Sequence, residues 1–199
     1  MKVTILGANG KTGVEVVKQA LEAGYGVVGV VREDSNLVSS PNLTFVVGDA
    51  TDPAVIAKAS KDSDVIISTL GTTSMKSTVM TDAVKAVITA SKTTGRKRFI
   101  LMSSFAVGGN KLGGLAKMMG NMMKDKSNSE SILKTSSLDW TIVYAALLTN
   151  EPKGSGLRVV PSTEKIGMKH KIARADVASF MLEEAKNNAY VKKEVTISK

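Results

Sequence analysis

Short apolar runs alternate along the first half of the chain with segments whose apolar residues recur at helical spacing. Apolar residues three and four positions apart predict helices at residues 14–21 and 78–92, the second ending at Gly95. Pro53 after the capping residue Asp52 predicts the start of a further helix. The continuous apolar runs are typical of parallel strands that are buried on both faces. These runs lie at residues 3–6, 27–31, 43–47, 65–69 and 99–102.

The second half of the chain follows the same alternation less regularly. A glycine-rich loop at residues 108–114 precedes a predicted helix at 115–135, and an apolar run at 140–143 predicts a sixth strand. A predicted helix at 175–185 and a terminal strand at 195–197 follow. This alternation predicts an α/β fold, namely a Rossmann-like doubly wound parallel sheet flanked by helices, with a small C-terminal elaboration. Ligands of such folds bind beyond the carboxyl ends of the strands, so we expect the binding residues in the loops that follow the strands.

The loop after the first predicted strand is rich in glycine and opens the first predicted helix. Glycines permit a tight turn and let the backbone approach a pyrophosphate, while the free N–H groups at the helix start attract it. A glycine-rich turn without a ligand is the alternative, which its position after the first strand disfavours. We therefore expect a dinucleotide to bind this turn. The residues expected to hold it are Gly7, Asn9, Gly10, Lys11, Thr12 and Gly13.

The end of the second strand indicates which dinucleotide the loop binds. Arg32 follows that strand directly, and Glu33 comes next. A guanidinium suits the 2′-phosphate of NADP, with charge-assisted hydrogen bonds worth roughly 1.5–3 kcal/mol. Lys11 and Ser35 are placed to assist. In the alternative, Arg32 is a surface charge and Glu33 binds the ribose hydroxyls of NAD. NADPH is the predicted cofactor, and NAD remains open.

Two further strand-end loops are placed to flank the cofactor. Gly48, Asp49 and Ala50 follow the third strand, near the expected adenine. Leu70, Gly71 and Thr72 follow the fourth strand, beside the middle of the cofactor. Capping of the next turn is the alternative role for Asp49. The complete series of strand-end loops favours a binding role.

Composition restricts the remaining chemistry. No apolar run in the 199 residues approaches the roughly 18 residues that cross a bilayer. Only Met1 and Lys2 precede the first apolar segment, so we expect no cleavable secretory signal and a cytoplasmic location. The chain has no cysteine, which excludes disulfides and thiolate ligands. A single histidine, His170, disfavours a metal site and a hydrolase triad.

The net charge of +9 raises the question of whether the protein binds nucleic acid, since basic proteins gain affinity for its phosphate backbone. The lysines are spread along the chain without a basic run, and aromatic residues make up only 4%. Binding of a cofactor and a substrate that carry several negative charges accounts for the surplus of positive charge equally well. We expect a small-molecule partner, no nucleic-acid or membrane partner, and a monomer or homodimer. The length suits a single NAD(P)-binding domain, residues 1–199, whose C-terminal half forms the substrate cleft.

Together these motifs resemble the atypical short-chain dehydrogenase/reductases, in particular the NmrA-like branch that includes biliverdin-IXβ reductase, also known as flavin reductase. The resemblance covers nearly the whole chain and implies reductase chemistry on an NAD(P)-binding Rossmann fold. The best-matched segments are Gly7 to Gly13, Val31-Arg32, Gly48-Asp49, Leu70-Gly71-Thr72, Ser103-Ser104, residues 131–141 and residues 174–178.

The chain departs from this superfamily at the position of the general acid. Ordinary members carry a Tyr-x-x-x-Lys pair in the helix after the fifth strand, and the tyrosine gives a proton to a carbonyl oxygen. Matching that helix to the family places Lys126 at the lysine position, as a cofactor contact, and Met122 at the tyrosine position. Glu130 lies one turn further on. A thioether has no proton to donate, so ordinary alcohol–ketone chemistry is disfavoured. Leu147 stands where biliverdin reductase has histidine, and Asn36 where a second arginine grips the 2′-phosphate.

A flavin or quinone ring accepts hydride without a protein acid, because its own ring atoms carry the charge and solvent supplies the proton. The leading prediction is therefore an NAD(P)H-dependent oxidoreductase that transfers hydride to a flavin-like or quinone-like acceptor. Ser104 is the candidate catalytic residue, placed to touch the reacting ring, and Ser103 is the candidate cofactor contact beside it. Tyr144 replaces the lost acid only if it points into the cleft, and a packed tyrosine is favoured.

Methionines after the glycine-rich loop are candidate walls of the acceptor site, with core packing the favoured alternative. They are Met118, Met119, Met122 and Met123, together with Leu115. Two other functions stay open. One is a nonenzymatic NAD(P)H-binding redox sensor or regulator, as the NmrA-like branch suggests. The other is an epimerase or dehydratase acting on a nucleotide-linked sugar, which the short chain and the missing tyrosine disfavour.

Overall fold

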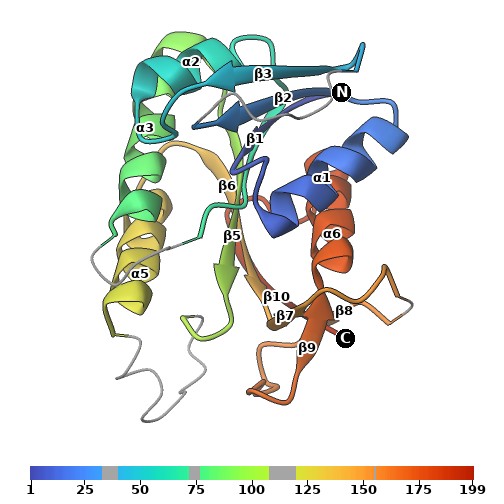
Figure 1. The fold of residues 1–199 in the computed structure, drawn as a ribbon. Coiled ribbons are helices and arrows are strands. Elements are labelled where there is room, and N and C mark those ends of the chain that lie inside the picture. The colour runs from blue at the N-terminus through green and yellow to red at the C-terminus, as the bar shows by residue number, and fades with distance from the viewer. Residues whose placement is uncertain (33–39, 72–76, 108–119, 155) are drawn as a thin grey trace.

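An eight-stranded sheet runs through the molecule in the order β3-β2-β1-β4-β5-β6-β10-β8 (Figure 1). This computed structural model describes residues 1–32, 40–71, 77–107, 120–154 and 156–199. Neighbouring strands are parallel except at one edge, where β8 pairs antiparallel with β10. The strands, in sheet order, are β3 (Leu43–Val47), β2 (Gly26–Val31), β1 (Lys2–Leu6), β4 (Val65–Ser68), β5 (Arg98–Ser104), β6 (Asp139–Ala145), β10 (Lys193–Ser198) and β8 (Arg158–Val160).

The strand order reverses between β1 and β4. β1 pairs with β2 on one side and with β4 on the other, and both pairs are parallel. The loops that follow β1 and β4 therefore diverge toward opposite faces, which opens the crevice where doubly wound folds bind their ligands. This topology confirms the predicted Rossmann-like fold and places the glycine-rich turn at the crevice.

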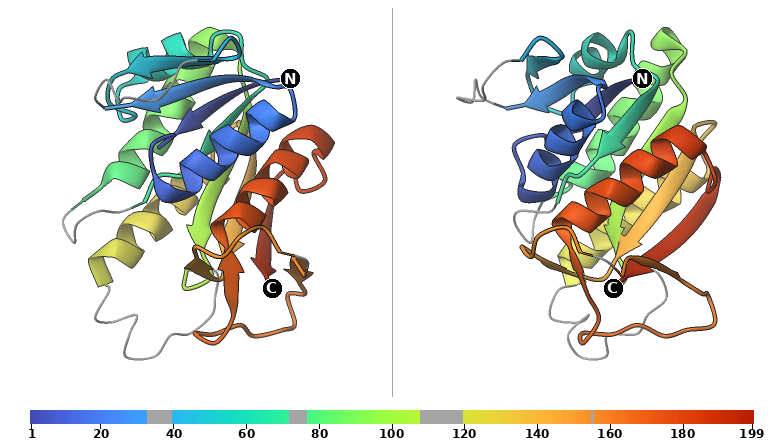
Figure 2. Two further views of the ribbon diagram at one scale, coloured as in Figure 1. Left: turned by 45° about the vertical axis from the view of Figure 1, so that its right-hand side comes forward. Right: turned by 90° about the vertical axis from the view of Figure 1, so that its right-hand side faces the viewer.

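Helices cover both faces of the sheet, as the two views of Figure 2 show. α1 (Lys11–Glu22) and α6 (Arg174–Asn187) pack against each other on one face. On the other face α3 (Val79–Thr94) lies between α2 (Pro53–Ser60) and α5 (Gly120–Lys134). Because side chains alternate along a strand, Ile5 of β1 joins the core under α1 and α6, whereas Leu6 joins the core under the other three helices.

The predicted helix boundaries are confirmed where capping residues set them. Asp52 precedes α2, and its carboxylate accepts a hydrogen bond from the Ala54 N–H at 2.8 Å. Gly95 ends α3 in the left-handed conformation, at φ +70°, and its N–H donates to the Ser91 carbonyl at 3.0 Å. Both ends follow from local chemistry, which explains why they were predictable.

Other boundaries differ from the prediction. α1 begins at Lys11 rather than at residue 14, because the glycine turn leads directly into it. The strand predicted at 65–69 ends at Ser68. The helix predicted at 115–135 is observed as α5 from Gly120, and residues 115–119 lie outside the described part.

The C-terminal part contains three strands that the sequence did not predict, each of three residues. β7 (Leu147–Thr149) and β9 (Lys171–Ala173) pair in parallel as a small second sheet, and β8 extends the main sheet. Three residues are too few to show a periodicity. Among the described residues, no helix is long and apolar enough to cross a membrane.

Candidate functional site

A backbone hydrogen bond within the turn closes the loop between β1 and α1. Gly7 has φ +79°, and the Gly10 N–H donates to the Gly7 carbonyl at 2.9 Å. Gly10 caps α1 without a side-chain hydrogen bond, and the first turn of the helix has no acidic residue. The N–H groups at the start of α1 therefore carry no side-chain cap and present the positive end of the helix dipole. This geometry favours an anionic group.

Close packing explains the glycine spacing. A Cβ atom at Gly13 would lie 2.0 Å from the Gly7 carbonyl oxygen, so only glycine fits where α1 crosses the turn. A Cβ atom at Gly10 would lie 3.2 Å from the same oxygen, a tight contact that a shift of a few tenths of an ångström relieves. Thr69 at the end of β4 holds the turn from the other side, since its hydroxyl lies 3.1 Å from the Leu6 carbonyl and 3.2 Å from that of Gly7. The backbone is thus built to let a ligand approach closely, which fits a pyrophosphate.

A cleft of about 790 Å³, including the space at its open mouth, lies over this turn. Four strand-end loops contribute to its walls, as the sequence predicted. The predicted residues that line it are Gly7, Asn9, Gly10, Arg32, Gly48, Asp49, Ala50, Leu70 and Gly71. Val30, Thr69 and Val79 line it as well and were not predicted as contacts. Val79 has no sequence signal of this role, because it opens a helix and is otherwise an ordinary core-facing residue.

Asp49 combines the two roles that its position allowed. Its Oδ1 accepts hydrogen bonds from the N–H and the hydroxyl of Thr51, both at 2.8 Å, so it closes the turn after β3 while also lining the cleft. These two hydrogen bonds, and then the charge of Arg32, keep the pKa of the Asp49 carboxyl below its usual value. Arg32 is exposed at the other wall of the cleft. An ionised Asp49 and a cationic Arg32 therefore face the space expected for the adenosine end.

The remaining predicted residues of the turn lie beside the cleft rather than in its lining. Lys11 is exposed at the first position of α1, and Thr12 and Gly13 are buried behind it. Their contribution is backbone N–H groups at the helix start. Thr72, Glu33, Ser35 and Asn36 lie outside the described residues.

Ser103 and Ser104 at the end of β5 point to opposite faces of the sheet. The Ser104 hydroxyl is half-buried and accepts a long hydrogen bond from the Ala106 N–H at 3.4 Å, the backbone-capping role that was its alternative. The Ser103 hydroxyl is buried and donates to Glu130 Oε1 on α5 at 2.5 Å. Ser103 does not line the cleft, so its predicted cofactor contact receives no support from the geometry. The alternation of side chains along β5 accounts for this difference.

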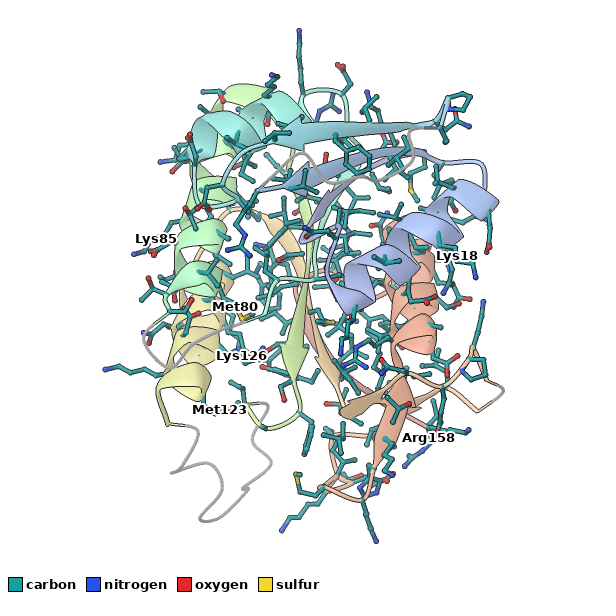
Figure 3. The ribbon with its side chains drawn as sticks, in the orientation of Figure 1. Lys18, Met80, Lys85, Met123, Lys126 and Arg158 are labelled. Atoms are coloured by element: carbon teal, nitrogen blue, oxygen red, sulfur yellow. The ribbon has the colours of Figure 1, made fainter. Side chains whose placement is uncertain are left out.

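Lys126 lies where α5 faces the start of α3. Its ammonium is 3.5 Å from the thioether sulfur of Met80, and Figure 3 shows the two side chains close together. Burial lowers the pKa of Lys126, although the nearby charges of Glu130 and Asp125 act in the opposite direction. Val79, the residue before Met80, lines the cleft. Lys126 itself does not line the cleft, so its predicted cofactor contact stays a prediction.

The predicted methionine wall is only partly described. Met123 is half-buried near the start of α5 (Figure 3). Nothing is described for the side chain of Met122, and Leu115, Met118 and Met119 lie outside the described residues. The prediction for these residues stays a prediction.

Tyr144 is a packed tyrosine, as favoured from the sequence. It is 4% exposed, does not line the cleft, and its phenol oxygen lies 2.8 Å from carboxylate oxygens of Glu130 and Glu194. Burial, followed by the charge of Glu130, raises the pKa of the Tyr144 phenol. Tyr144 is thus no substitute for a tyrosine general acid in the cleft.

His170 is hydrogen-bonded within its own turn, where its Nδ1 lies 3.0 Å from the Gly167 nitrogen.

Comparison with known proteins agrees with this site. The profile of a family described as NAD(P)H-binding matches residues 7–188. An uncharacterized chloroplastic protein of Arabidopsis thaliana is 28% identical over 180 residues, which cover 80% of this chain and 64% of that protein. This chain therefore spans less than two thirds of that relative's length. A UPF0659 protein of Saccharomyces cerevisiae is 28% identical over an alignment of 211 residues, which covers 99% of this chain and 92% of that protein.

A solved structure shares both the fold and part of the sequence. ChuY, an anaerobilin reductase from Escherichia coli, is 25% identical, with a TM-score of 0.86 over 99% of this chain and 96% of that chain. These relationships agree with the resemblance to atypical short-chain dehydrogenase/reductases. On the match over residues 7–188, the chain belongs to the NAD(P)H-binding family.

Proposed function

We propose that this protein is an NAD(P)H-dependent reductase whose acceptor is a flavin-like or quinone-like ring, reduced without a tyrosine general acid. The observation that carries the proposal is a cleft over the glycine turn that has no tyrosine among the described residues of its lining. Met122 occupies the family's tyrosine position, and Tyr144 is turned into a buried cluster away from the cleft. A reaction in this site must use an acceptor that needs no strong protein acid.

The residues present fit a dinucleotide. Gly7, Asn9 and Gly10 form a cradle for the pyrophosphate next to the start of α1. The exposed Arg32 guanidinium suits the 2′-phosphate, which favours NADPH over NADH by roughly 1.5–3 kcal/mol. Asp49 would face the adenine end. Bound NADPH supplies a hydride.

Two further groups are assigned roles near the reacting end. Lys126, whose ammonium lies 3.5 Å from the thioether sulfur of Met80, would hold the nicotinamide ribose. Ser104, half-buried at the end of β5, would orient the acceptor ring or bond one developing charge. The acceptor would lie in the C-terminal half of a single domain. We expect a monomer or homodimer acting on a small molecule.

The relatives support reductase chemistry without defining the acceptor. ChuY is named an anaerobilin reductase, so a similar chain carries a reductase name. Leu147, at the position where biliverdin reductase has histidine, disfavours a biliverdin-like acceptor. It is exposed at the start of β7. Flavins and quinones therefore remain the favoured class.

An acceptor panel tests this function. Purified protein should oxidise NADPH much faster with free flavin or a quinone than with simple ketones. Met122→Tyr should not accelerate flavin reduction, because that acceptor needs no protein acid. Acceleration of ketone reduction by Met122→Tyr alone, with no flavin or quinone activity in the parent, would contradict the proposed acceptor class.

The second candidate is a nonenzymatic redox sensor, in which cofactor occupancy changes the binding of a partner protein. The same observation favours it, because a cleft without a tyrosine in its described lining can bind a dinucleotide and perform no chemistry. Tight NADPH binding with no turnover across the whole panel would select the sensor. Turnover with any ring acceptor at a rate that depends on the enzyme concentration selects the reductase.

A further inference from the structure

The start of α3 is capped by a side chain from another helix. Met80 and Thr81, the second and third residues of α3, have N–H groups that no earlier carbonyl of the helix can accept. The Asp125 carboxylate on α5 accepts both, with Oδ2 3.1 Å from the Met80 nitrogen and Oδ1 3.0 Å from the Thr81 nitrogen. The Thr81 hydroxyl also donates to the Asp125 carbonyl, at 3.1 Å. Because α3 and α5 lie side by side (Figure 1), this one residue joins the two helices at the start of α3.

The residue at the N-cap position of α3 does not perform this role itself. Thr78 has φ −112° and ψ 16°, outside the extended conformation that an N-cap residue usually adopts, and its side chain caps no N–H group. Its hydroxyl instead donates to Asp82 Oδ2, at 2.6 Å. Asp125 is 4% exposed, so little water competes for the two N–H groups that it accepts. Asp125 therefore supplies the cap that Thr78 does not.

The capped turn carries one wall of the dinucleotide cleft. Val79, the first residue of α3, lines the cleft and shares its apolar lining with Val30 and Leu70. The Val79 N–H makes a long hydrogen bond, at 3.3 Å, to the hydroxyl oxygen of Ser77. Since Asp125 holds the next two residues of the helix, the place of Val79 depends on where α5 holds α3. A shift of this first turn would move an apolar wall of the cleft.

Two helices begin at the cleft, and their starts differ in charge. Gly10 opens α1 without a side-chain cap, and the first turn of α1 has no acidic residue. The start of α3 instead faces the Asp125 carboxylate and carries Asp82 in its own first turn. Negative groups at a helix start offset the positive end of its dipole. A pyrophosphate is therefore drawn to α1, whereas α3 offers the dinucleotide an apolar side chain.

We propose that Asp125 is a positioning residue of the cofactor site, which sets the place of Val79 in the cleft by capping α3 from α5. The inference rests on the dinucleotide binding within the proposed function and not on the acceptor. Asp125 does not line the cleft, so it acts through Val79. Loss of the cap should weaken NADPH binding to the folded protein, whereas a purely structural cap would affect only the stability of the fold.

Asp125→Asn separates these two roles. Asparagine keeps the shape of the side chain, but its one carbonyl oxygen can accept from only one of the two N–H groups, while its amide nitrogen faces the other. We expect the Kd for NADPH to rise roughly three- to fivefold, the size of a lost apolar contact, in titrations under conditions where the protein is folded. Urea unfolding should give a lower midpoint.

Thr141→Val is the matched control. It also keeps the shape of the side chain, and it removes a fully buried hydroxyl that lies 2.8 Å from the Tyr190 carbonyl oxygen. Thr141 lies near the amino end of β6, away from the cleft. This variant should lower the urea midpoint and leave the Kd for NADPH unchanged. A Kd in Asp125→Asn equal to that of the parent would overturn the inference.

A double variant tests whether Asp125 acts through Val79. Val79→Ala alone should also raise the Kd roughly three- to fivefold, because it removes the same contact. Adding Asp125→Asn to Val79→Ala should then change the Kd little. Independent effects would multiply to a roughly tenfold or greater rise, and that result would overturn the inference.

A further readout needs no variant. In the parent, bound NADPH should slow hydrogen exchange of the Met80 and Thr81 amides within the period before the amides of β6 exchange, because the cleft wall and its cap are coupled. Exchange of these two amides at an unchanged rate would also overturn the inference. A parent protein that binds neither NADPH nor NADH would instead overturn the proposed function, and this inference with it.

Discussion

Alanine at position 13 tests how the glycine turn is built. Glycine inside a helix is usually worse than alanine by roughly 0.5–1 kcal/mol, so propensity alone predicts that Gly13→Ala stabilises α1. The structure predicts the opposite sign, because the new Cβ would lie 2.0 Å from the Gly7 carbonyl oxygen and 2.9 Å from the Gly7 carbonyl carbon. Overpacking of this kind costs about 1–3 kcal/mol. We expect Gly13→Ala to lower the free energy of unfolding by roughly 1–2 kcal/mol and to displace the turn.

Gly10→Ala is the matched comparison. Its Cβ would lie 3.2 Å from the same oxygen, which needs a shift of only a few tenths of an ångström, and it would enter the cleft. Urea unfolding should give an unchanged midpoint for Gly10→Ala and a lower midpoint with the same slope for Gly13→Ala. NADPH at a concentration of about a hundred times its Kd for the parent should stabilise the parent by about 2.7 kcal/mol. The same concentration should stabilise both variants by less, because they bind NADPH more weakly. A Gly13→Ala protein as stable as the parent would refute the packing argument.

Three other predictions concern charge and chemistry. Arg32→Ala should remove most of a roughly ten- to hundredfold preference for NADPH over NADH in cofactor titrations. The preference should weaken with salt, and Lys85→Ala, which removes one charge from the outer face of α3 (Figure 3), should leave it intact. Ser104→Ala should slow flavin reduction about tenfold, or about 1.4 kcal/mol, in initial-rate assays without abolishing it. Arg98→Met should cost about 3–5 kcal/mol in urea unfolding, because it strips the cation from a buried carboxylate. Arg158→Met, which breaks an exposed pair, should leave the unfolding midpoint unchanged.

The parts of the fold that were predictable follow from local chemistry. Four of the predicted parallel strands, β1, β2, β4 and β5, are apolar runs because both of their faces are buried, whereas β3 at the edge of the sheet is partly exposed. Asp52 and Gly95 mark helix ends through their own backbone preferences. The short strands β7, β8 and β9 depend instead on partners distant in the chain. Leu147, for example, pairs with Lys171. Three residues carry too little pattern to reveal such a pairing.

The residues of the site also divide into those marked by their local sequence and those brought together only by the fold. The glycine turn and Arg32 were predictable because their spacing from a strand is itself the signal. The cluster around Glu130 was not, since Tyr144 and Glu194 are 50 residues apart in the chain and meet only through the pairing of β6 with β10. Glu130 stood out from the sequence only as a residue one turn after Lys126. The direction of Ser103 required the register of β5.

A kinetic isotope effect tests hydride chemistry in this cleft most directly. The parent protein would be loaded with NADPH that carries deuterium at C4 and mixed in a single turnover with a flavin or a quinone. Reduction should be slower than with unlabelled NADPH, because breaking the C4–H bond limits the chemical step. Gly10→Ala should react more slowly at the same NADPH concentration, because its Cβ enters the cleft and weakens cofactor binding. NADPH that binds tightly to the parent but stays unoxidised with every acceptor would contradict the reductase function and select the sensor.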